Sequence, residues 1–177
     1  MHEEIIMAGF GGQGVIFMGK FLAYLGMRKG NQVTYLPSYG AEVRGGTANC
    51  TVIISSEEIA SPLSSCPYTA IVMNKPSLDK FEPRIKKDGL LILNSSLINR
   101  DPDRDDLKII KVPATEIAMN LGNSRVANMV ALGAYIIQKK VVPLKTVLDH
   151  LQDVLPKRAH HLLEINKEAL REGAKIK

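Results

Sequence analysis

The sequence predicts an α/β fold with a largely parallel sheet flanked by helices and followed by a C-terminal helical segment. Short apolar runs bounded by glycine, proline or polar residues alternate with segments in which apolar residues recur at helical spacing. The first run, Ile5–Met7, leads through a glycine-rich turn into a helical pattern, which is the order of a βαβ unit. From Ala114 onward the pattern is helical only.

The individual elements follow from these patterns. Strands are expected at Glu4–Ala8, Gln32–Leu36, Thr47–Ser55, Thr69–Met73, Leu90–Leu93 and Lys108–Val112. Helices are expected from about Gln13 to Lys29, from Pro76 to before Gly89, across Ala114–Lys140 with an interruption at Gly122-Asn123, from Val142-Pro143 to Pro156, and across Lys157–Glu172. Pro37 is expected to end the second strand, and the first two strands with their helix to form a βαβ unit.

Length and composition bound the class of protein. A chain of 177 residues can bury roughly 70% of its unfolded surface, and with no linker or internal repeat we expect one domain over residues 1–177. No apolar run is long enough to span a bilayer, and the start Met-His-Glu-Glu lacks a signal pattern. We therefore expect a cytoplasmic protein that does not act in a membrane.

The net charge of +5 is unevenly distributed, because no acidic residue occurs between Glu4 and Glu42. Aromatic residues do not alternate with a basic stripe, so the sequence argues against nucleic-acid binding. An acidic ligand and an acidic partner protein both fit this balance.

The sequence predicts no catalytic residues and no metal site in this chain. Cys50 and Cys66 are too few for an iron–sulfur centre, and both are expected to be small buried apolar side chains. The histidines lie at the N-terminus or in the helical tail, where surface or partly packed positions are expected. No serine or cysteine has a base partner at a recognisable spacing.

The turn after the first strand carries the first candidate site. Gly9, Gly11 and Gly14 match G-x-G-x-x-G, and with Gly12 and Gln13 they precede a helix whose N-terminus favours an anion. A Rossmann-like dinucleotide site also needs an acidic residue at the end of the second strand, where this chain has Leu36-Pro37-Ser38. The P-loop motif G-x-x-x-x-G-K-[ST] can be aligned in two ways, and neither fits. In the alignment from Gly9, Val15 replaces the phosphate-binding lysine, and in the alignment from Gly14, Phe21 replaces the Mg²⁺-binding hydroxyl. Close packing against the sheet or a subunit, and contact with a ligand, both remain open for this turn.

A second loop is expected at the same edge of the sheet, where open α/β folds bind ligands. Its candidate residues are Ser38, Tyr39, Gly40, Glu42, Arg44, Gly45, Gly46 and Thr47. Arg44 could hold a carboxylate or phosphate bidentately, although Glu42 and Arg44 also fit solvent-exposed charges on a turn. We expect the two loops to have a joint role, facing a small molecule or a protein.

Four segments resemble the gamma subunit of 2-oxoacid:ferredoxin oxidoreductases. They are Gly9-Phe10-Gly11-Gly12-Gln13-Gly14-Val15, Ser38 to Cys50, Asn74-Lys75-Pro76-Ser77-Leu78 and Asn128-Met129-Val130-Ala131-Leu132-Gly133. Together they cover nearly the whole chain in the right order. The segment Arg44-Gly45-Gly46-Thr47-Ala48-Asn49-Cys50 is most similar to the 2-oxoglutarate branch of this family.

The resemblance implies a subunit of an oxidoreductase complex, inactive when isolated. In this family the complex decarboxylates a 2-oxoacid on thiamine diphosphate with Mg²⁺, passes electrons through [4Fe–4S] clusters to ferredoxin, and forms an acyl-CoA from CoA. Those cofactors belong to the other subunits, so the implied partners are the alpha, beta and ferredoxin-like delta subunits. A free-standing nucleotide- or CoA-binding module, and the equivalent subunit of an indolepyruvate or pyruvate oxidoreductase, stay as alternatives. The isolated chain could also form a homodimer through a partner surface left bare.

Overall fold

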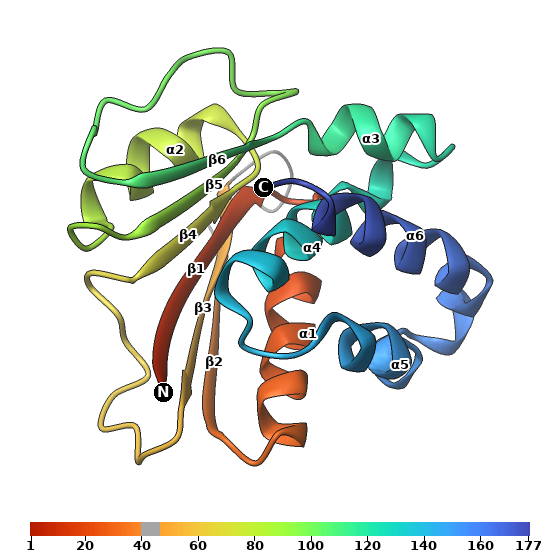
Figure 1. The fold of residues 1–177 in the computed structure, drawn as a ribbon, viewed down its shortest axis with the longest axis horizontal. Coiled ribbons are helices and arrows are strands. Elements are labelled where there is room, and N and C mark those ends of the chain that lie inside the picture. Colours follow the sequence, from red (N-terminus) through yellow and green to blue (C-terminus); the bar gives the residue numbers. More distant parts are fainter. Residues whose placement is uncertain (40–46) are drawn as a thin grey trace.

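A mixed six-stranded sheet lies between two layers of helices in the computed structural model, which describes residues 1–39 and 47–177 (Figure 1). The strands are β1 (His2–Phe10), β2 (Gln32–Tyr39), β3 (Thr47–Ser55), β4 (Thr69–Val72), β5 (Leu90–Asn94) and β6 (Lys108–Val112). Their order across the sheet is β2-β3-β1-β4-β5-β6. This architecture confirms the predicted α/β fold.

The strand directions confirm a largely parallel sheet, with β3 as its antiparallel strand. Strands β1, β4, β5 and β6 pair in parallel, whereas β3 is antiparallel to both β1 and β2. Strand β2 therefore runs in the direction of β1, as a βαβ unit requires, but β3 lies between them. The reason is burial: Cys50, Val52 and Ile54 of β3 are fully buried, which a central position in the sheet provides.

The second strand is longer than expected, because Pro37 lies inside β2 and does not end it. Proline cannot donate a ladder hydrogen bond, but β2 is the edge strand of the sheet, so one of its sides has no neighbouring strand in the described structure. Pro37 is paired with Cys50 in the register of β2 and β3. The edge position thus explains why the proline is tolerated.

The helices form two unequal layers (Figure 1). One face of the sheet is covered by α1 (Val15–Arg28), α4 (Ala127–Lys139), α5 (Leu144–Val154) and α6 (Leu163–Ala174), and the other by α2 (Lys75–Phe81). The helix α3 (Ala114–Asn120) begins directly after β6. Alternate residues of β1 enter the two cores, Ile5 and Met7 on the α1 side and Ile6 and Ala8 on the α2 side.

The predicted helices are confirmed, with shifted ends. The expected interruption at Gly122-Asn123 separates α3 from α4, where Asn123 accepts a hydrogen bond from the backbone N–H of Arg125. The last helix begins at Leu163, later than expected, because Lys157–Leu162 forms a 3₁₀ turn. No helix in the described part of the chain is long and apolar enough to cross a membrane.

The two cysteines differ in environment. Cys50 is buried as expected, with its thiol donating to the carbonyl of Val15 at 3.3 Å, but the same expectation for Cys66 is wrong, because Cys66 is exposed. Cys66 belongs to the irregular stretch between β3 and β4, which has no regular element to bury it. Burial raises the pKa of the Cys50 thiol to about 12.

Iodoacetamide is therefore expected to alkylate Cys66 and spare Cys50 in the native protein at pH 8. A thiol of that pKa is ionised to only about 1 part in 10⁴ at this pH, and only the thiolate reacts. Mass spectrometry of tryptic peptides measures the two sites separately. Both thiols should react in urea, and equal labelling of the native protein would contradict the burial of Cys50.

Candidate functional site

A pocket of about 220 Å³ opens at the carboxyl ends of β1 and β4. After β1 the chain crosses to β2 on one side of the sheet, whereas β4 leads to β5 and β6 on the other side. Open α/β sheets bind ligands at such a reversal of strand order. The described residues that line the pocket are Gly12, Gln13, Met73, Leu97, Thr115, Ser124, Arg125 and Ala127.

Glycine is required in the first turn for two reasons, a positive φ at some positions and a close neighbour at others. Gly12 and Gly14 have φ values of 100° and 72°, which other residues rarely adopt. A Cβ on Gly14 would lie 2.4 Å from Nδ2 of Asn128, and a Cβ on Gly9 would lie 2.5 Å from Oε1 of Gln13. The spacing G-x-G-x-x-G in this chain therefore leaves room for two carboxamide side chains.

Those carboxamides hold the turn from both sides. Gln13 accepts a hydrogen bond from the backbone N–H of Phe10 at 2.7 Å and donates to the carbonyl of Met73 at 3.2 Å. From the other side Asn128 donates to the carbonyl of Gly14 at 3.1 Å. The turn is thus tied to the end of β4 and to the first turn of α4.

The electrostatics of the pocket favour an anion. Arg125 is exposed and is the one charged side chain among the described lining residues. The first N–H groups of α1 have no partner within the helix, and Gly14 at its N-cap provides no side-chain hydrogen bond. Ala127, the first residue of α4, also lines the pocket. The guanidinium of Arg125, the glycine turn that precedes α1 and the first residue of α4 therefore line one opening.

The second loop begins and ends at the same edge of the sheet. In the strand register Tyr39 pairs with Ala48, and Thr47 pairs with Phe10, which directly precedes the glycine turn. Ser38 is exposed and Thr47 is partly buried. The candidates Gly40, Glu42, Arg44, Gly45 and Gly46 lie outside the described residues.

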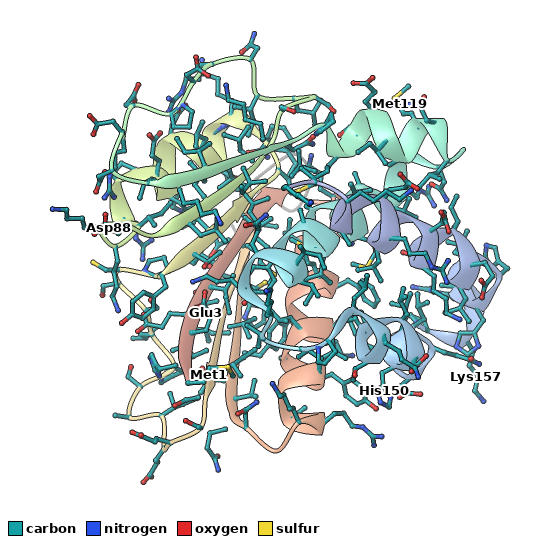
Figure 2. The ribbon with its side chains drawn as sticks, viewed as in Figure 1. Met1, Glu3, Asp88, Met119, His150 and Lys157 are labelled. Atoms are coloured by element: carbon teal, nitrogen blue, oxygen red, sulfur yellow. The ribbon has the colours of Figure 1, made fainter. Side chains whose placement is uncertain are left out.

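Exposed apolar side chains accompany the pocket at this edge. Phe10, the last residue of β1, is 39% exposed, Leu97 after β5 is 47% exposed, and Met119 on α3 is 64% exposed. Figure 2 shows Met119 on the outer side of α3. Exposed apolar groups beside a polar pocket are typical of a surface that docks another protein.

Sequence reasoning missed Thr115, Ser124 and Arg125 in this pocket. The available signal was the break at Gly122-Asn123, which places Arg125 at the start of a helix. The histidines lie elsewhere, as expected: His150 is on α5, away from the carboxyl ends of the strands (Figure 2). Its Nδ1 lies 2.8 Å from Oδ2 of Asp153. In residues 1–39 and 47–177, no group of three or more His, Cys, Asp or Glu side chains could hold a metal ion.

Nearly the whole chain is similar to proteins of one known family. Residues 4–176 match the family described as pyruvate ferredoxin/flavodoxin oxidoreductase. Ketoisovalerate oxidoreductase subunit VorA of Methanothermobacter marburgensis is 39% identical over 130 residues, which are 73% of this chain and 27% of that protein. The chain therefore spans about a quarter of the length of that relative. 2-oxoglutarate synthase subunit KorC of Methanocaldococcus jannaschii is 32% identical over 89% of this chain and 86% of its own length.

Solved structures share the fold. The gamma subunit of a keto/oxoacid ferredoxin oxidoreductase from Geobacter sulfurreducens superposes with a TM-score of 0.87 at 26% identity, over 99% of this chain and 96% of that one. A 2-oxoglutarate:ferredoxin oxidoreductase from Magnetococcus marinus, solved with 2-oxoglutarate, coenzyme A and succinyl-CoA bound, gives 0.88 at 26% identity and covers 98% of this chain but 30% of that one. The predicted resemblance is confirmed, and the chain belongs to the pyruvate ferredoxin/flavodoxin oxidoreductase family.

Proposed function

We propose that this chain is the gamma subunit of a 2-oxoacid:ferredoxin oxidoreductase complex in the cytoplasm, inactive on its own. The observation that carries the proposal is the match to the Geobacter gamma subunit, which covers 99% of this chain and 96% of that one. In the proposed complex the alpha, beta and ferredoxin-like delta subunits hold thiamine diphosphate, Mg²⁺ and the [4Fe–4S] clusters. That complex oxidises a 2-oxoacid to an acyl-CoA and passes the electrons to ferredoxin.

The carboxyl edge of the sheet is the surface that we assign to this role. It carries the glycine turn, the ends of the second loop and the pocket with Arg125, and we propose that it faces the thiamine-binding subunits and binds the phosphates of CoA. Support comes from the guanidinium of Arg125 and from the glycine turn before α1, which both line the pocket and suit a phosphate. The exposed Phe10, Leu97 and Met119 suit contact with a partner.

We propose 2-oxoglutarate as the substrate of the complex. The KorC relatives support this choice, because the one from Methanocaldococcus jannaschii matches this chain over most of both lengths. Pyruvate and indolepyruvate are the alternatives, and the pyruvate synthase subunit PorC of Thermotoga maritima is 27% identical to this chain. The substrate itself would bind in the partner chains.

Co-purification tests the proposal directly. We expect the tagged chain to bring its partner subunits, and the complex to reduce a low-potential dye with 2-oxoglutarate and CoA faster than with pyruvate or indolepyruvate. Absence of 2-oxoacid oxidation by the purified assembly would contradict it. In calorimetry the isolated chain is expected to bind CoA weakly or not at all, whereas a free-standing CoA-binding module would bind measurably.

Two arginine variants test the edge. Arg125→Ala is expected to raise the KM for CoA in the assembled complex about tenfold, the loss typical of one charge-assisted hydrogen bond. Arg44→Ala should fold but assemble poorly or raise the CoA requirement. Arg171→Ala is the control, because Arg171 pairs with Glu168 on the surface of α6. Normal assembly and kinetics in both edge variants would contradict the assigned surface.

A further inference from the structure

The side chain of Gln13 lines the pocket, and both ends of its carboxamide are hydrogen-bonded to the surrounding protein. Its Oε1 accepts from the backbone N–H of Phe10 at 2.7 Å and from Nδ2 of Asn74 at 3.4 Å. Its Nε2 donates to the carbonyl of Met73 at 3.2 Å. The backbone N–H of Gln13 also donates to the carbonyl of Phe10 at 3.1 Å. Both the backbone and the side chain of Gln13 therefore bond to Phe10 across the turn.

A second carboxamide extends this arrangement across the sheet. Asn94, at the end of β5, is 1% exposed and donates to the carbonyl of Met73 at 3.4 Å and to Oγ1 of Thr115 at 2.9 Å. Asn74 in turn caps α2 by accepting from the backbone N–H of Ser77 at 2.9 Å. The ends of β1, β4 and β5 and the starts of α2 and α3 are therefore joined by three amides.

These amides are neutral, which matters beside an anion site. A carboxylate in the place of Gln13 could not donate to the carbonyl of Met73 and would bring negative charge to the lining of the pocket. The absence of a side chain at Gly9 follows from the same contact, since a Cβ there would lie 2.5 Å from Oε1 of Gln13. Gly9 and Gln13 thus act together to place the turn.

We propose that Gln13 is a positioning residue, which sets the affinity for CoA by holding the glycine turn that lines the pocket in one conformation. The inference rests on the proposed function of this edge and adds a role for a residue that need not touch the ligand. Preorganised donors bind an anion more tightly than mobile ones because less conformational entropy is lost on binding. Loss of the Gln13 contacts should therefore weaken CoA binding and leave the chemical step unchanged.

The test compares Gln13→Met, which keeps the side-chain volume, and Gln13→Ala in the assembled complex. Both are expected to raise the KM for CoA about tenfold with kcat changed less than about twofold. Hydrogen exchange at the amides of residues 11–15 should be faster in both variants, already in the isolated chain. The control is Asn166→Ala, which removes a buried amide that donates to the carbonyl of Leu162, just before α6, and is not among the residues that line the pocket.

The outcomes separate this inference from the proposed function. If Arg125→Ala raises the KM for CoA and both Gln13 variants leave it unchanged, the positioning role is wrong while the anion pocket stands. If Arg125→Ala and the Gln13 variants all leave the KM unchanged, the proposed CoA contact fails as well. Unchanged exchange at residues 11–15 in Gln13→Met would overturn the positioning role whatever the kinetics show.

Discussion

Gly173→Ala is expected to lower the free energy of unfolding by about 3 kcal/mol, at the upper end of the usual cost of overpacking. Gly173 lies where α6 crosses α4, and a Cβ there would be 1.9 Å from the carbonyl oxygen of Val130. Gly133 on the opposite helix has the reciprocal contact, with a Cβ position 2.2 Å from the carbonyl oxygen of Leu170. Both obstacles are helix backbone, so a rotamer change cannot relieve them, and the helices must separate.

Urea denaturation of Gly173→Ala decides between two opposite expectations. Helix propensity alone predicts that alanine stabilises α6 by about 1 kcal/mol relative to glycine. The close crossing predicts a loss. Glu168→Ala, at a partly exposed position of the same helix, should change stability by less than about 0.5 kcal/mol. A stabilised Gly173→Ala variant would show that α4 and α6 do not pack as described.

Gly14→Ala is expected to cost about 3 kcal/mol, from two effects of similar size. The φ of 72° places alanine in the left-handed region, and the new methyl group would lie 2.4 Å from Nδ2 of Asn128. Asn128 cannot move away freely, because it is hydrogen-bonded to the carbonyl of Gly14 at 3.1 Å and lies at the buried start of α4. Chemical denaturation measures the loss.

Gly12→Ala is the matched control for the turn. Its φ of 100° also disfavours alanine, but nothing lies within 4 Å of its Cβ position, so it should cost only about 1–2 kcal/mol. The difference between the two glycine variants should shrink when Asn128→Ala is added to both, because the steric obstacle is then removed. Equal losses at Gly12 and Gly14 in the native background would contradict the contact with Asn128.

Most of the elements could be predicted from periodicity and turn residues. The strands Thr47–Ser55 and Lys108–Val112 have the predicted bounds, and the break at Gly122-Asn123 separates two helices as expected. The errors arose where the neighbours of a strand decide the outcome. Pro37 is compatible with β2 only because β2 is at the edge, and the place of β3 between β1 and β2 depends on which strand faces need burial.

The candidate site was predictable in part. The predicted strand directions placed the glycine turn and the ends of the second loop at one edge of the sheet. The pairing of Phe10 with Thr47 confirms this placement for the described residues. The contribution of Thr115 and Arg125 could not be predicted, because they enter the pocket from segments far from the turn in sequence. Their position depends on how α3 and α4 pack against the sheet. The roles of Arg44 and its neighbours stay predictions.

The sequence by itself determined the class of fold, the family resemblance and the location of the glycine turn between a strand and a helix, because these depend on local periodicity and on glycine's backbone freedom. Only the tertiary structure decided what each glycine is for. Gly9 faces the amide of Gln13, and Gly14 faces the amide of Asn128, which lies more than a hundred residues away in sequence. The physical reason is that a missing Cβ is required by whatever packs against it, and that neighbour is known only once the chain has folded.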